Sequence, residues 1–83
     1  MRIDKYLNAV NITKRRAVAE DMLAHGVVFI NEQVVKKSKE VKVGDIIEIK
    51  YLERTEKFEV LQIPVTKSTP KSKMFEYVKK IEG

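Results

Sequence analysis

Basic side chains gather in two short segments of the first half of this sequence. Residues 1–16 carry five Lys or Arg against one acid, a net charge of +4, and residues 36–42 carry four Lys against one Glu, a net charge of +3. Residues 17–35 hold three acids and no base, and residues 43–83 hold eight bases and seven acids. Clustered Lys and Arg bind phosphate groups, so this chemistry suits a polyanion partner. The alternative is that each cluster is an ordinary solvated surface.

The two basic segments supply the candidate binding side chains. Arg holds a phosphate through two hydrogen bonds or stacks on an unpaired base, whereas Lys acts as a point charge. Arg15 and Arg16 lie at the start of a predicted helix, where positive charge opposes the helix dipole. An anionic ligand would explain that cost. The candidates are Arg2, Lys5, Lys14, Arg15, Arg16, Lys36 and Lys37, with Ser38 beside them.

Three other polar residues have both a functional and a structural interpretation. His25 could contact the ligand, or it could end a helix, where partial positive charge suits the C-terminal dipole. Asn31 could contact the ligand or shape a turn. Asp4 either favours the first turn of its helix or orients a neighbouring basic side chain.

The composition argues against an enzyme. The chain has one His and no Cys, and its three Gly are scattered, so we predict no catalytic residue, no metal site and no cofactor. Eighty-three residues predict one domain with function on its surface. The longest apolar run, Val27–Ile30, is far below the ~18 residues that span a bilayer. We therefore expect a cytoplasmic protein that binds no membrane.

Apolar spacing predicts two helices at the start of the chain. The first shows the i, i+3, i+4, i+7 pattern of one buried helix face, made by Ile3, Tyr6, Leu7 and Val10. We expect the second to run from about Lys14 to His25, with Thr13 as its N-cap and Gly26 closing it in a left-handed conformation.

After Gly26 the apolar period changes to two, which predicts β-strands. A first strand over 27–30 turns at 31–32 into a return strand that starts at Val34. Further strands are expected over 46–51 and from Phe58 to the Pro64 break.

The end of the chain reads as a linker followed by a short helix. Residues 66–72 are rich in Ser, Thr, Lys and Pro, and helical spacing then relates Met74, Tyr77, Val78 and Ile81. An alternative is that residues 67–83 cover the edge of the sheet. The predicted fold is α+β: a helix-turn-helix pair packed on a small, mostly antiparallel sheet, with a short C-terminal helix. Residues 1–63 would form the binding domain and 64–83 the linker and tail.

Five segments in this order resemble the S4 RNA-binding domain, the family named after small-subunit ribosomal protein four. They are Arg2–Leu7, Thr13–Ala17, Gly26–Asn31, Val35–Ser38 and Val43–Ile47, so the motif core covers about residues 2–50. The sequence looks most like the short stand-alone members, such as the fifteen-kilodalton ribosome-associated heat-shock protein and the ribosome-quality-control S4 protein. One departure is Glu32, where the family usually has Gly.

The resemblance implies that the fold joins the two basic segments into one RNA-binding surface. It implies a non-catalytic protein that recognises structured ribosomal RNA on a large subunit with a stalled nascent chain, with tRNA as a further partner. Two alternatives stay open: a general rRNA- and tRNA-binding factor in ribosome assembly, and a DNA-binding helix-turn-helix protein. We expect a monomer.

Overall fold

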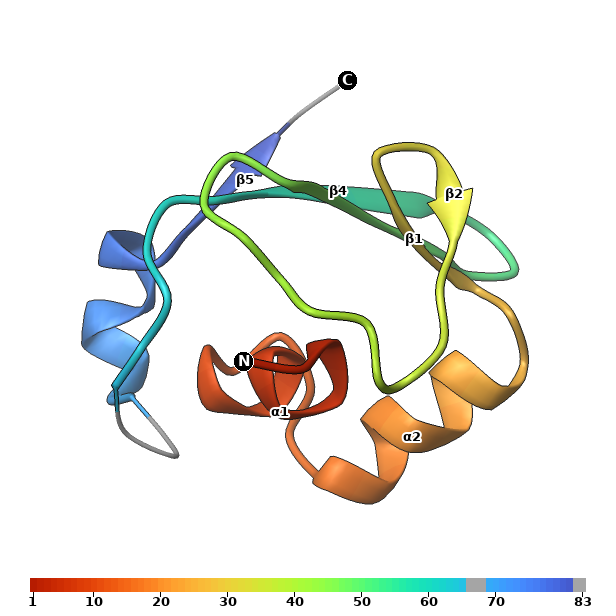
Figure 1. Ribbon diagram of the computed structural model, residues 1–83, viewed down its shortest axis with the longest axis horizontal. Helices are drawn as coiled ribbons and strands as arrows, with labels where there is room; N and C mark the ends of the chain where they lie inside the picture. The colour runs from red at the N-terminus through yellow and green to blue at the C-terminus, as the bar shows by residue number, and fades with distance from the viewer. Residues whose placement is uncertain (66–68, 82–83) are drawn as a thin grey trace.

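The computed structural model describes residues 1–65 and 69–81 (Figure 1). Two helices come first, α1 (Ile3–Ala9) and α2 (Arg16–Ala24). They are followed by strands β1 (Val28–Ile30), β2 (Gln33–Val34), β3 (Ile46–Lys50) and β4 (Thr55–Val60), then a 3-10 helix η1 (Lys71–Glu76) and strand β5 (Val78–Ile81). No helix within these ranges is long and apolar enough to cross a membrane.

The strands form one antiparallel sheet in the order β2-β1-β3-β4-β5. Ile47 at its centre pairs with Ile30 on one side and Phe58 on the other, so buried side chains line one face. Both helices lie against that face (Figure 1). The predicted α+β architecture, a helix pair on an antiparallel sheet, is confirmed.

The core lies between the helices and the sheet. Its helical part consists of the predicted stripe on α1 together with two side chains of α2: Ile3, Tyr6, Leu7, Val10, Ala19 and Leu23. The sheet contributes its inward-facing residues, among them Val28, Ile30, Ile47, Ile49, Phe58 and Val60. Burial of this continuous apolar surface is the main force holding the helices in place.

The predicted start of the second helix is wrong. α2 begins at Arg16, and its N-cap is Arg15, whose φ of −134° and ψ of 143° are those of an extended chain. Thr13 therefore precedes the helix by too many residues to cap it. Its hydroxyl is buried without a hydrogen-bond partner in the described structure. At the other end, Gly26 has the expected left-handed conformation, with φ of 68°.

The hairpin between β1 and β2 turns on two residues. Asn31 and Glu32 have φ of 51° and 71°, the positive values that a two-residue type I′ turn requires. Asn accepts this conformation readily, but Glu does so at a cost. The departure from Gly at this position therefore leaves the turn in place and strains it.

The predicted C-terminal helix over 74–81 is also wrong. Residues 71–76 form the short 3-10 helix η1, and β5 then pairs with β4, with Val78 opposite Val60. Met74 and Tyr77 pack against the core from η1 and from its C-terminal end, and Val78 is buried in β5. The positions of these apolar residues in the sequence therefore resemble the spacing of a helix. The alternative that this segment covers the sheet edge is confirmed for 78–81. Residues 66–68 of the predicted linker lie outside the described residues.

Candidate nucleic-acid interface

Backbone hydrogen bonds join the start of the chain to the second basic segment. The N–H of Ile3 donates to the carbonyl of Lys39 at 2.8 Å, and the N–H of Val41 donates to the carbonyl of Met1 at 2.9 Å. The segment between β2 and β3 turns down from the sheet toward the helices to make this contact (Figure 1). Two segments far apart in sequence are thus held side by side.

A buried carboxylate gathers two arginines at the same place. The side chain of Asp4 is completely buried, and Arg2 donates to it from Nε at 3.2 Å and from Nη2 at 2.7 Å. The N–H of Lys5 donates to Asp4 Oδ1 at 2.9 Å. Arg16, at the start of α2, places Nη2 3.8 Å from Asp4 Oδ2. Asp4 thus orients basic neighbours, which is one of the two roles that we predicted for it from the sequence.

The electrostatics of this cluster keep Asp4 ionised. Burial by itself raises the pKa of Asp4, but the hydrogen bonds from Arg2 and Lys5 and the charges of Arg2 and Arg16 oppose it, and the pKa lies below its ordinary value. Arg16 has a second acidic partner, Glu20, at 3.6 Å one turn along α2. These contacts offset the cost of placing Arg16 at the positive end of the helix dipole.

The other predicted basic residues flank this cluster and are exposed. Their charges are without an ion-pair partner in the parts of the chain that the structure describes; they are Lys5, Lys14, Arg15, Lys36 and Lys37. Ser38 is exposed in the same loop. We call these residues, with Arg2 and Arg16, the basic surface. Within the described residues these cations have no acidic partner, so their charge can face a ligand.

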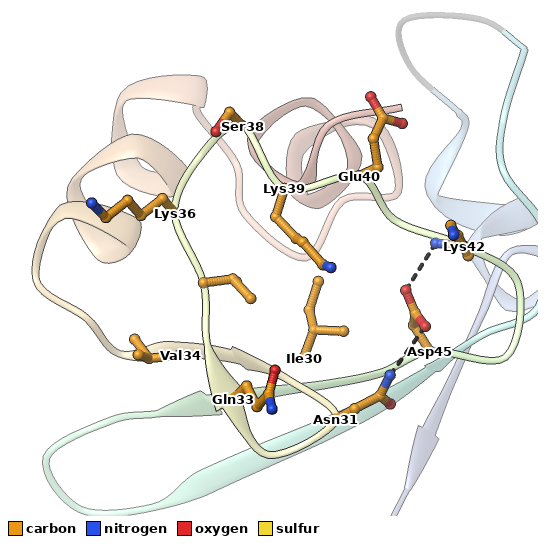
Figure 2. Close-up of a pocket in the computed structure, with 11 residues that line it drawn as sticks. Ile30, Asn31, Gln33, Val34, Lys36, Ser38, Lys39, Glu40, Lys42 and Asp45 are labelled. Carbon is orange, nitrogen blue, oxygen red and sulfur yellow. Dashed lines mark hydrogen bonds between the residues drawn. The ribbon is translucent and has the colours of Figure 1, made fainter.

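His25 and Asn31 both have structural partners. His25 is the C-cap of α2, and its Nδ1 lies 2.7 Å from the carbonyl oxygen of Asp21. The side-chain amide of Asn31 donates to Asp45 at 3.2 Å (Figure 2). Its oxygen accepts from the N–H of Ile46 at 3.1 Å. The structural alternative is therefore observed for each residue. A contact of either with a ligand stays a prediction.

A hollow lies between the β1–β2 hairpin and the loop that leads to β3 (Figure 2). Its volume is about 560 Å³, and Lys39 lies on its wall. Sequence reasoning missed Lys39 as a candidate, although the residue belongs to the same basic run as Lys36 and Lys37. Elsewhere within 1–65 and 69–81, no group of three or more His, Asp or Glu is placed to hold a metal ion.

Comparison with known proteins assigns the family. Residues 1–47, more than half of the chain, match the S4 domain. The chain belongs to the S4 domain family. This S4-domain protein is 45% identical over 78 residues to the "RQC P-site tRNA stabilizing factor" of Helicobacter pylori J99, covering 94% of this chain and 93% of that one. The protein of the same name in Streptococcus pneumoniae R6 is 34% identical over 79 residues, covering 94% and 90%.

Solved structures share the fold of this S4-domain protein. The trimeric structure of Vibrio cholerae Heat Shock Protein 15 superposes with a TM-score of 0.86 at 25% identity, covering 98% of this chain and 81% of that one. The solution structure of a hypothetical protein, HP1423, also gives 0.86, at 42% identity and with 100% and 99% coverage. The trimeric state of the Vibrio protein gives no support to the predicted monomer.

Proposed function

We propose that this S4-domain protein is a non-catalytic RNA-binding factor of the cytoplasm. Its target is the large ribosomal subunit with a stalled nascent chain, where it contacts ribosomal RNA and the P-site tRNA. The observation that carries the proposal is the convergence of Arg2 and Arg16 on the buried Asp4, beside the second basic segment. The names of the relatives in Helicobacter and Streptococcus support the tRNA contact.

The geometry suits a folded RNA backbone. Structured RNA is recognised largely by its shape and by its phosphates and ribose hydroxyls. Two guanidiniums held by one fixed carboxylate lose little conformational freedom when they bind, so more of the interaction energy remains as affinity. The exposed Lys14, Arg15 and Lys37 extend the positive charge on either side.

A DNA-reading role fits the second helix poorly. Helix-turn-helix proteins insert this helix into the major groove, where its side chains contact base edges. On α2 the exposed positions after Arg16 include Ala17, Glu20, Asp21 and Ala24. The two acids would face the DNA phosphates, and the alanines offer no hydrogen bond to a base.

The experiment is co-sedimentation with purified large subunits that carry a P-site tRNA. Lys14→Glu combined with Arg15→Glu should weaken binding by at least about tenfold, since two phosphate contacts become repulsions. Arg16 is left unchanged because its charge also faces Asp4. A charge reversal there would change the stability of the fold as well as the affinity for RNA.

The matched control is Lys73→Glu combined with Lys79→Glu. Both side chains are exposed on η1 and β5, away from the basic surface, and the change in net charge is the same. This control should sediment with subunits nearly as the unmodified protein does. Equal binding by a folded Lys14→Glu/Arg15→Glu variant would refute the proposed interface.

A further inference from the structure

The hollow beside β2 has walls that are fixed independently of any ligand. The turn before β3 is tied to the hairpin because Asn31 donates to Asp45, and Asp45 also accepts from the N–H of Lys42 at 2.9 Å. The opposite side is tied to the start of the chain through the carbonyl of Lys39 and the N–H of Ile3. A hollow braced on both sides keeps its shape and offers a preformed site.

Its lining combines an apolar floor with a cationic wall. Ile30 and Val35 contribute side chains of the core, and Val34 is exposed at the rim. The Lys39 side chain extends into the hollow above Ile30 (Figure 2). Lys39 has no ion pair among residues 1–65 and 69–81.

The acids that line the hollow are already engaged. Glu40 forms an ion pair with the N-terminal amine of Met1 at 3.0 Å, and Asp45 accepts one hydrogen bond from Asn31 of the hairpin and one from the N–H of Lys42 in its own turn. Two further polar groups of the lining are the Lys39 ammonium and the Gln33 amide, and both side chains are exposed. They supply hydrogen bonds to a planar polar molecule whose faces are apolar.

We propose that this hollow receives one unstacked nucleotide of the bound RNA. The base lies against Ile30 and Val34, and the Lys39 ammonium donates to an acceptor atom on its edge, with Gln33 as the second polar contact. The volume of about 560 Å³ is within the ~300–1,000 Å³ typical of small-ligand sites. Single-stranded RNA is recognised through bases that are splayed out in this way. The inference rests on the proposed function and adds a site for an unpaired base.

The test compares two RNA hairpins that differ only by one bulged uridine. Fluorescence anisotropy should show that the unmodified protein binds the bulged hairpin about fivefold or more tightly than the hairpin with a fully paired stem. Both hairpins have the same stacked terminal loop, so only the bulge adds a splayed base for the hollow. Lys39→Ala should remove this preference. Methyl NMR should show the Ile30 resonance shifting with the bulged hairpin and shifting much less with the paired one.

Lys37→Ala is the matched control. It removes the same charge from the same loop, but Lys37 is not one of the residues that line the hollow. It should weaken binding of both hairpins and leave their ratio unchanged. A protein that binds both hairpins equally, or a Lys39→Ala variant that keeps the preference, overturns the nucleotide site alone. Failure to bind either hairpin overturns the RNA-binding function and this site together.

Discussion

Arg2 and Asp4, two residues apart, form a two-pronged ion pair in which the carboxylate is fully buried and the guanidinium reaches the surface. Arg2, a residue of the basic surface, is thus held in place by a carboxylate of the core. Because Arg16 faces the same carboxylate, the relative placement of α1 and α2 also depends on it. Stability and binding are therefore linked at Asp4.

Asp4→Asn should lower the free energy of unfolding by about 2 kcal/mol, because Arg2 loses a charge-assisted partner and Arg16 a nearby counter-charge. The measurement is the urea midpoint followed by circular dichroism. Asp21→Asn is the control, since that carboxylate is exposed and its only ion pair within residues 1–65 and 69–81 is with His25 at 3.5 Å. If the two variants unfold at the same urea concentration, the stabilising role of Asp4 is incorrect.

Asp4 should also contribute to the loss of folding stability at low pH. Its pKa in the folded protein lies below its ordinary value of 3.8, so the unfolded chain binds the proton more readily. The stabilisation is complete above pH 3.8 and is lost as the pH falls through the folded pKa. The difference in unfolding free energy between the unmodified protein and Asp4→Asn should shrink over that interval. A difference that stays constant down to the lowest pH would argue against this linkage.

Glu32→Gly should stabilise the protein by roughly 0.5–1 kcal/mol, because Gly adopts a φ near 71° without the steric cost that Glu incurs. Thermal unfolding would show a midpoint higher by a few degrees. Glu53→Gly is the comparison, since Glu53 is not among the residues with positive φ and should gain nothing. A lower midpoint for Glu32→Gly would mean that the turn is not strained.

The salt dependence of RNA binding should report how many phosphates the basic surface contacts. The logarithm of the affinity should fall linearly with the logarithm of the salt concentration, by about 0.7 to 0.9 per phosphate neutralised. In Lys14→Ala/Arg15→Ala the slope should become shallower by roughly 1.4 to 1.8, measured by anisotropy over a salt series. An unchanged slope would exclude both side chains from phosphate contact.

Local patterns in the sequence predict much of this fold. The apolar stripe of α1, the Gly26 helix end and the Asn31 turn are set by residues within a few positions of one another, and each is observed. The pattern failed at the end of the chain because spacing of three and four describes both a helix and a 3-10 turn followed by a strand. Pairing of Val78 with Val60 decides between them, and that contact is not local.

The candidate site shows the same division. The basic residues could be found from the sequence, because an excess of Lys and Arg in a segment needs no knowledge of the fold. Two contacts could not be found: the joining of Ile3 to Lys39 and the approach of Arg16 to Asp4 both depend on how the helices pack on the sheet. The close spacing of Arg2 and Asp4 was the one available signal, and it left two interpretations of Asp4 open. Thr13 was misassigned because α2 begins only at Arg16, with the extended Arg15 as its N-cap.

The most direct test of the central proposal is the affinity of the purified protein for three defined particles: large subunits with a peptidyl-tRNA in the P site, the same subunits without tRNA, and small subunits. The measurement is co-sedimentation at fixed salt, since affinities for RNA are comparable only at one salt concentration. We predict the tightest binding to the large subunit with tRNA, weaker binding to the empty large subunit and none to the small subunit. Preferential binding to small subunits, or equal binding to all three, would contradict the account.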